Sequence, residues 1–258
     1  PDARIGKIQQ NTIDIEDKDI VLAMVQSLSQ KEYEPEVFSS FGLAIFDECH
    51  HLGAEVFSKS MAKVSSKYML GLSATPDRKD GLRKVFEWYI GPMVYSSIKE
   101  KNKDYIEARL YEYYDEDPTY SKLELTYRKK PCMPKMINNI SDCIHRNLFI
   151  NDLIKTEYEK GRKILVLGDR REYLNRTEKW IKENINPNIV GQYVGGMKPS
   201  ELRDSQEKDI ILGTYSMASE GMDIPKLNTC ILASPKSDVE QSVGRIFREK
   251  ACVRTHHP

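Results

Sequence analysis

The chain has 258 residues, enough for one large domain or two domains of ordinary size. Hydrophobic residues make up 40% and charged residues 30%, a globular composition that argues against long-range disorder. The 39 Lys and Arg balance the 39 Asp and Glu, which excludes a globally basic nucleic-acid binder but not a local basic groove. No apolar run approaches the roughly 18 residues of a membrane span, and we expect no membrane attachment and no secretory signal.

The five cysteines are odd in number and contain no CxxC pair, which argues against a disulfide framework or a structural zinc site. Cys132, Cys143 and His145 could be imagined as metal ligands, but a fourth ligand at suitable spacing is missing. This cysteine usage fits a reducing intracellular compartment. The chain begins at Pro1 and ends without a closing helix or strand pattern, so we expect it to be a fragment of a longer polypeptide.

The first part of the chain alternates short apolar runs with amphipathic stretches. Buried strands are expected at residues 20–25, 43–46 and 68–72, a polar turn at 26–29, and helices at 54–64 and 81–90. Continuous apolar strands between amphipathic helices predict a parallel sheet that is covered on both faces.

Residues 99–130 differ from their surroundings, because they are densely charged and hold six of the fourteen tyrosines. They are interpreted as a long connector with some extended structure, and a specific partner-binding surface is the alternative.

The alternating pattern then returns. Strands are expected at residues 163–167, 189–190, 209–213 and 229–233, and helices at 146–160, 171–184 and 237–248. Two such series predict an α/β protein with two parallel-sheet domains. The expected division is residues 1–98, a connector at 99–140, and residues 141–258.

Two polar clusters follow apolar strands of the first part. Asp47-Glu48-Cys49-His50 follows residues 43–46, and adjacent carboxylates at a strand end suit phosphoryl chemistry, with one binding Mg²⁺ and the other orienting water. Ser73-Ala74-Thr75-Pro76 follows residues 68–72. Taken alone, the first cluster could be a solvated acidic strand end, and the second an ordinary turn closed by proline.

Two further clusters lie in the second part. Gly213-Thr214 leads through a small-residue stretch to Gly221-Met222-Asp223, where backbone amides and a hydroxyl suit phosphate oxygens, although a plain loop is the alternative. Gln241, Arg245 and Arg248 share one face of the expected last helix, and two guanidiniums on one face suit phosphates. The alternative is a solvated charged face.

In this order, the runs DECH, SATP, GT…EGMDIP and QSVGRIFR resemble motifs II, III, V and VI of superfamily 2 helicases. The runs MVQSL, GLSATPDRKDGL, ILVLGDRR and TYSMASEGMDIP look like the branch of the xeroderma pigmentosum group B helicase. They look closest to the related helicases of large DNA viruses and phages. The resemblance covers roughly residues 4–250.

The resemblance implies two RecA-like domains, the first truncated at its N-terminus, with ATP and Mg²⁺ bound in the cleft between them. For the first domain it implies that Asp47 binds Mg²⁺, Glu48 activates water, His50 contacts the SAT segment, Ser73 and Thr75 couple hydrolysis to movement, and Gln26 and Ser27 contact nucleic acid. For the second domain it implies two groups of residues at the nucleotide: Gly221 and Asp223 line the ATP cleft, and Gln241 approaches the nucleotide. Arg245 and Arg248 approach the γ-phosphate, Arg248 as the arginine finger. Thr214, Asp169 and Arg170 lie near the nucleic-acid backbone.

The chain departs from the family by lacking the phosphate-binding GxxxxGK[ST] loop. In residues 191–200, the nearest approach, the lysine is one position late and Pro199 replaces the required Ser or Thr. We therefore expect an ATP-dependent DNA helicase or translocase whose fragment is inactive alone. The alternatives are a degenerate nucleic-acid-binding module without turnover, and an RNA helicase or restriction-enzyme motor subunit. DNA is the expected partner, RNA is possible, and a viral protein would act in the host cytoplasm or nucleus.

Overall fold

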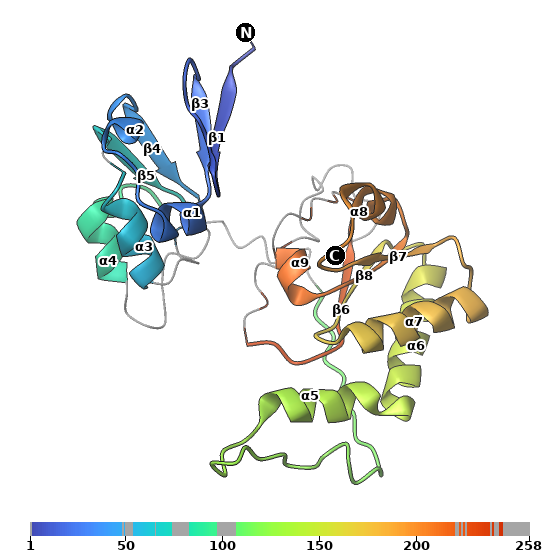
Figure 1. Ribbon diagram of the computed structural model, residues 1–258. Coiled ribbons are helices and arrows are strands. Elements are labelled where there is room, and N and C mark those ends of the chain that lie inside the picture. Colours follow the sequence, from blue (N-terminus) through green and yellow to red (C-terminus); the bar gives the residue numbers. More distant parts are fainter. Residues whose placement is uncertain are drawn as a thin grey trace. The chain divides into compact units, whose positions relative to one another are not determined.

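A computed structural model of the chain describes residues 2–47, 49, 54–64, 66–73, 83–96, 107–219, 222, 224, 226–237, 239 and 243–244. The chain divides into two compact units, residues 1–100 and 101–258. Both are α/β, as the sequence predicts, and the described part of each unit contains parallel strands (Figure 1). The domain boundaries at residues 98 and 140 stay predictions.

The described part of the first unit contains two small sheets. The three-stranded sheet has the order β2-β1-β3, with β1 (Ile5–Gln9) antiparallel to β2 (Thr12–Asp14) and parallel to β3 (Ile20–Ala23). The other sheet pairs β4 (Leu43–Phe46) with β5 (Tyr68–Gly71) in parallel. The described helices are α1 (Val25–Gln30), α2 (Glu36–Ser39), α3 (Ala54–Met61) and α4 (Arg83–Tyr89).

The predicted polar turn at residues 26–29 is wrong, because these residues lie in helix α1. Leu28 is buried and packs in a cluster with Ile8 of β1 and Phe38 of α2. The hydroxyl of Ser27 accepts the backbone N–H of Gln10 at 2.9 Å, which ties the helix to the turn after β1. Tertiary packing therefore determines the structure of a segment whose composition is typical of a turn.

The first unit also corrects the prediction of strands buried on both faces. Leu22 of β3 is 64% exposed, and Leu43 and Ile45 of β4 are 52% and 56% exposed. On the opposite face, Phe46 packs in a small core with Cys49 and Met61. In the part of this unit that the structure describes, strands β1 and β4 are therefore covered on one face, and β2 is exposed at every residue.

The second unit is built on a four-stranded parallel sheet with the order β7-β8-β6-β9. The strands are β6 (Ile164–Leu167), β7 (Val190–Tyr193), β8 (Ile210–Gly213) and β9 (Thr229–Leu232). The helices are α5 (Met133–Asp142), α6 (Ile144–Glu159), α7 (Arg171–Asn184), α8 (Pro199–Gln206) and α9 (Tyr215–Ser219). The expected strands and the helices at 146–160 and 171–184 are confirmed within a few residues. Most of the expected helix at 237–248 lies outside the described residues.

Two apolar cores cover the two faces of this sheet. Every residue of β6 and β8 is buried, and successive side chains enter opposite cores. One core contains Ile164 and Val166 with side chains of α6 and α7, and the other contains Leu165 and Leu167 with residues of α9. This is the burial that near-continuous apolar runs predict for a parallel strand.

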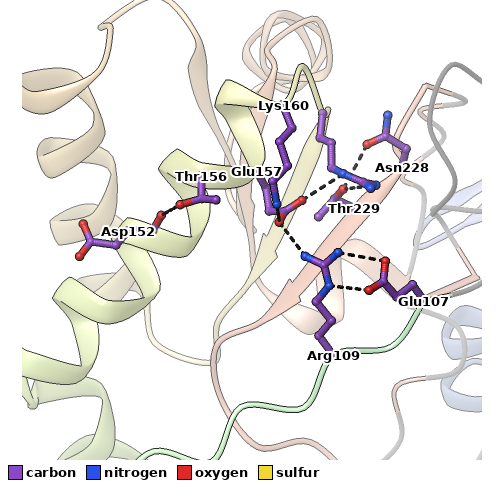
Figure 2. A network of polar contacts seen from close by, with 9 residues as sticks. Glu107, Arg109, Asp152, Thr156, Glu157, Lys160, Asn228 and Thr229 are labelled. Carbon is purple, nitrogen blue, oxygen red and sulfur yellow. Dashed lines mark hydrogen bonds and ion pairs between the residues drawn. The ribbon is translucent and has the colours of Figure 1, made fainter.

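Residues 107–115 of the predicted connector pack against helix α6. The rings of Tyr111 and Tyr113 lie 5.8 Å and 5.5 Å from the ring of Phe149, measured between centroids. Arg109 Nη1 lies 3.2 Å from Glu157 Oε1, and this carboxylate also pairs with two further cations of the network in Figure 2. The described connector is therefore part of the packing of the second unit.

Candidate nucleotide and nucleic-acid site

The structure describes only some of the predicted site residues. Those outside the described residues are Glu48, His50, Thr75, Gly221, Asp223, Gln241, Arg245 and Arg248. Those described are Gln26, Ser27, Asp47, Ser73, Asp169, Arg170 and Thr214.

In the first unit, the described residues of the DECH and SATP runs follow neighbouring parallel strands. Strands β4 and β5 pair with Phe46 opposite Gly71, so Asp47 and Ser73 leave the same edge of the sheet. The exposed carboxylate of Asp47 therefore lies at the carboxyl end of a parallel strand, where ligands of α/β sheets bind.

Backbone hydrogen bonds connect these two strand ends. Leu72 N donates to Phe46 O at 2.8 Å, and Cys49 N donates to Leu72 O at 3.1 Å. The Cys49 side chain is buried in the core beside Phe46. A Cβ added at Gly71 would lie 2.9 Å from Ile90 Cδ1 and 3.5 Å from Cys49 Sγ. A larger residue at this position would therefore require the Ile90 side chain to move. Sequence reasoning assigned no role to Cys49, whose backbone N–H and buried side chain connect the segment after β4 to the end of β5.

The predicted nucleic-acid contacts in helix α1 differ in their surroundings. Gln26 is exposed, whereas Ser27 is buried and its hydroxyl binds the backbone of Gln10. In this structure Ser27 supports the helix, and a contact between Gln26 and nucleic acid stays a prediction.

In the second unit, Asp169 and Thr214 also follow neighbouring parallel strands. Strands β6 and β8 pair with Leu167 opposite Gly213, and Gly168 N donates to Gly213 O at 3.1 Å. Thr214 is half-buried and directly precedes α9, and its carbonyl accepts the N–H of Ala218. Described candidate residues of both units therefore lie at carboxyl edges of parallel sheets: Asp47 and Ser73 in the first unit, and Asp169 and Thr214 in the second.

Sequence reasoning missed Ser234, which connects the segments that follow β6, β8 and β9. Its buried hydroxyl accepts the backbone N–H of Asp169 at 2.8 Å, and its carbonyl accepts the hydroxyl of Tyr215. Burial raises the pKa of Tyr215 to about 12, so the hydroxyl stays a donor at neutral pH. The only signal in the sequence was the position of Ser234 directly after an apolar strand.

Arg170 is engaged in contacts within the second unit. Its Nη1 lies 2.9 Å from Asp169 Oδ2, its Nη2 donates to the carbonyl of Pro134 at 2.9 Å, and its Nε donates to Asn138 Oδ1. The guanidinium therefore holds helix α5 against the start of α7. A direct contact between Arg170 and a nucleic-acid backbone stays a prediction.

Described residues of the run EGMDIP belong to the core. Met222 and Ile224, on either side of Asp223 in the sequence, are 0% and 5% exposed and pack with Leu165 and Ile211. Met222 and Ile224 therefore contribute to the core that covers one face of the sheet.

A cavity of about 490 Å³ lies in the second unit between residues 107–113, helix α6 and strand β9. Its lining includes Arg109, Tyr111, Arg146, Phe149 and Leu232, and none of the predicted site residues that the structure describes. Within the described part of the chain, no three His, Cys, Asp or Glu side chains gather as a metal site would require. Among the described helices, none is both long and apolar enough to cross a membrane.

Two family descriptions match the chain. The family described as "Type III restriction enzyme, res subunit" matches residues 2–78. The family described as "Helicase conserved C-terminal domain" matches residues 145–250. The four motif-like runs fall inside these two matches.

Individual relatives give the same picture. A protein of Acanthamoeba polyphaga mimivirus named "Putative ATP-dependent RNA helicase" is 39% identical over 260 residues, which cover 99% of this chain and 49% of that protein. The "DNA 3'-5' translocase XPB2" of Sulfurisphaera tokodaii is 24% identical, over 83% of this chain and 57% of that protein. The chain thus spans about half the length of the relatives it matches.

A solved structure shares the fold. The crystal structure of the helicase MrfA bound to DNA and AMPPNP has a TM-score of 0.55 and 15% sequence identity, and the match covers 91% of this chain and 33% of that chain. At this level of identity the match shows the fold alone.

Proposed function

Because the chain belongs to the superfamily 2 helicases, we propose that it forms the motor part of a longer protein that couples ATP hydrolysis to movement along DNA. The observation that carries the proposal is the placement of candidate residues at carboxyl edges of parallel sheets in both units. ATP hydrolysis in this arrangement requires little covalent chemistry from the protein, whose task is positioning and electrostatic stabilisation.

Each candidate residue of the first unit has a separate task in this proposal. Asp47 is an exposed carboxylate at a strand end, which fits a Mg²⁺ ion that keeps most of its water ligands. When bound, Mg²⁺ would neutralise charge on the phosphates of ATP. The Glu48 carboxylate would orient the attacking water, and Ser73 would connect this loop to the nucleic-acid side.

The second unit would supply positive charge. Arg245 and Arg248 would stabilise the charge that develops on the γ-phosphate, and Gln241 would contact the nucleotide. Thr214 would contact the nucleic-acid backbone. Contacts to phosphate do not distinguish DNA from RNA, and the similar proteins carry names of both kinds. We place DNA first because the group B-like branch includes the archaeal DNA translocase.

The test is Glu48→Gln in the longer protein that contains this chain. Glutamine keeps the shape of the side chain and removes the carboxylate, so we expect turnover to fall at least about 100-fold while ATP binding survives. Glu55→Gln is the matched control, because Glu55 is an exposed acid of helix α3 in the same unit.

ATP hydrolysis would be measured alone, with DNA and with RNA of the same sequence. Stronger stimulation by RNA would assign the protein to RNA. Normal turnover in Glu48→Gln would remove this residue from the mechanism, and a wild-type protein that binds nucleic acid without hydrolysing ATP would be a binding module.

A further inference from the structure

An exposed basic loop lies in the second unit, outside every motif discussed above. This basic loop, residues 124–132, is closed by a bridge between Leu125 and Pro131. Cys132 N donates to Glu124 O at 2.7 Å, and Thr126 N donates to Lys130 O at 2.8 Å. The loop is therefore ordered by its own backbone and presents residues 127–129 at its tip.

The tip has an unusual backbone at Lys129. Its φ of 57° lies in the left-handed region, which glycine and asparagine adopt more readily than lysine. Lys129 N donates to Thr126 O at 2.9 Å, and the hydroxyl of Thr126 accepts the N–H of Lys130 at 3.3 Å. Since glycine would suit this backbone better, the lysine side chain is a candidate for a role outside folding.

The tip and the residue that follows it combine one aromatic ring with three consecutive cations. Tyr127 is 87% exposed, and the guanidinium carbon of Arg128 lies 5.3 Å from the centroid of its ring. Arg128, Lys129 and Lys130 are exposed, and none of them forms an ion pair within the part of the chain that the structure describes. An open aromatic face beside unpaired cations is the combination that binds single-stranded nucleic acid, where bases stack and phosphates need positive charge.

The basic loop shares a support with a predicted site residue. It leads directly into helix α5, and in Figure 1 the green segment before α5 runs along the side of this helix away from the sheet. Asn139 of α5 donates to Glu124 at 3.5 Å, and Arg170 donates to Pro134 at the start of the helix. Pro134 is four positions after Lys130, so these residues lie within about 14 Å of each other.

We propose that the basic loop is an additional contact for single-stranded nucleic acid. Tyr127 stacks on one base, and Arg128, Lys129 and Lys130 bind phosphates on either side of it. The inference rests on the proposed function for the class of partner, but it assigns the contact to residues that no helicase motif contains. A single strand is favoured over a duplex because paired bases keep their faces stacked on one another.

The first experiment measures charge. The full chain is titrated against a fluorescein-labelled oligo(dT) strand by fluorescence anisotropy, at several salt concentrations. The variant is R128Q/K129Q/K130Q, and the control K155Q/K179Q/K182Q removes the same charge from exposed positions of helices α6 and α7. At ~0.1 M salt we expect the variant to bind about 5-fold weaker if one phosphate contact is lost and about 100-fold weaker if three are lost, with a salt slope smaller by up to about 2. The control should bind like the wild type.

The second experiment measures stacking. Tyr127→Ala should weaken binding to the single strand by about 5- to 150-fold, while Tyr127→Phe keeps the ring and should stay close to the wild type. An unchanged affinity in Tyr127→Ala, with a loss in the charge variant, would assign the loop to duplex phosphates and overturn the proposal. Equal losses in the charge variant and its control would also overturn it.

Competition distinguishes nucleic acid from an acidic protein. Poly-glutamate at equal charge should displace the labelled strand much less well than unlabelled oligo(dT), because it offers no bases to stack on Tyr127. Equal displacement, or a wild-type chain that binds no oligonucleotide at low salt, would overturn the inference. The proposed function is judged separately, on Glu48-dependent ATP hydrolysis by the longer protein.

Discussion

Replacing Ser234 with alanine tests whether the end of strand β9 holds the predicted motif residues of the second unit in place. The hydroxyl of Ser234 accepts the backbone N–H of Asp169 at 2.8 Å, and the residue is 5% exposed. A buried donor that loses its acceptor costs about 1–3 kcal/mol, and the lower part of this range, about 1–2 kcal/mol, applies because Asp169 is only half-buried. For a unit the size of residues 101–258, we expect the Tm to fall by about 2–8 °C.

The assay follows the second unit by the fluorescence of Trp180. The chain has two tryptophans, of which Trp180 packs against the core of the second unit while Trp88 is 78% exposed in the first. A Trp88→Phe background therefore makes Trp180 the single reporter. Ser237→Ala, at an exposed position shortly after Ser234, is the control and should leave the Tm unchanged. A Tm in Ser234→Ala equal to that of the control would refute the reasoning.

Two further predictions concern one residue outside the described part and one inside it. In the longer protein, Arg248→Ala should keep nucleic-acid binding, but its stimulated ATPase rate should fall on the order of 10³-fold. The control Arg203→Ala, at an exposed position, should keep both the binding and the rate. A normal ATPase rate in Arg248→Ala would exclude the arginine-finger role. Hydrogen bonds from the backbone N–H of Asp117, the Tyr113 hydroxyl and the Cys143 thiol hold the pKa of Asp115 below its ordinary value. The Asp115 carboxylate therefore stabilises the fold above its unfolded pKa of about 3.9, and this stabilisation is lost as the pH falls through the lower folded pKa. Asp115→Asn should lower the Tm at pH 7, and its difference from the wild type should shrink below about pH 4; a difference that stays constant between pH 7 and pH 3 would contradict this sign.

The fold of the second unit could be predicted from the sequence because its pattern and its packing agree. The apolar runs at 163–167 and 209–213 become β6 and β8, which are buried on both faces. Similar runs in the first unit became strands with one exposed face, as at Leu43 and Ile45. The apolar residues of a strand predict that it favours an apolar environment. Whether each face is buried depends on which other segments cover it.

The charged segment at 107–132 could not be predicted beyond its composition. Its order comes from contacts with α6 and α5, such as Tyr113 with Phe149 and Glu124 with Asn139, and from backbone hydrogen bonds within residues 124–132. The positive φ of Lys129 was also hidden, because lysine is not a residue that indicates a left-handed turn.

In the candidate site, too, some features follow from the local sequence, whereas others depend on residues far away in the chain. A polar residue that directly follows an apolar strand, as Asp47 and Thr214 do, can be assigned to a sheet edge from the sequence alone. The groups that fix these residues come from distant parts of the chain: Ser234 is 65 positions from Asp169. No local pattern carries that pairing, because it exists only once β6 and β9 lie side by side with Leu167 opposite Leu232. A change at Ser234 should therefore act on the segment after β6 although no helicase motif includes it.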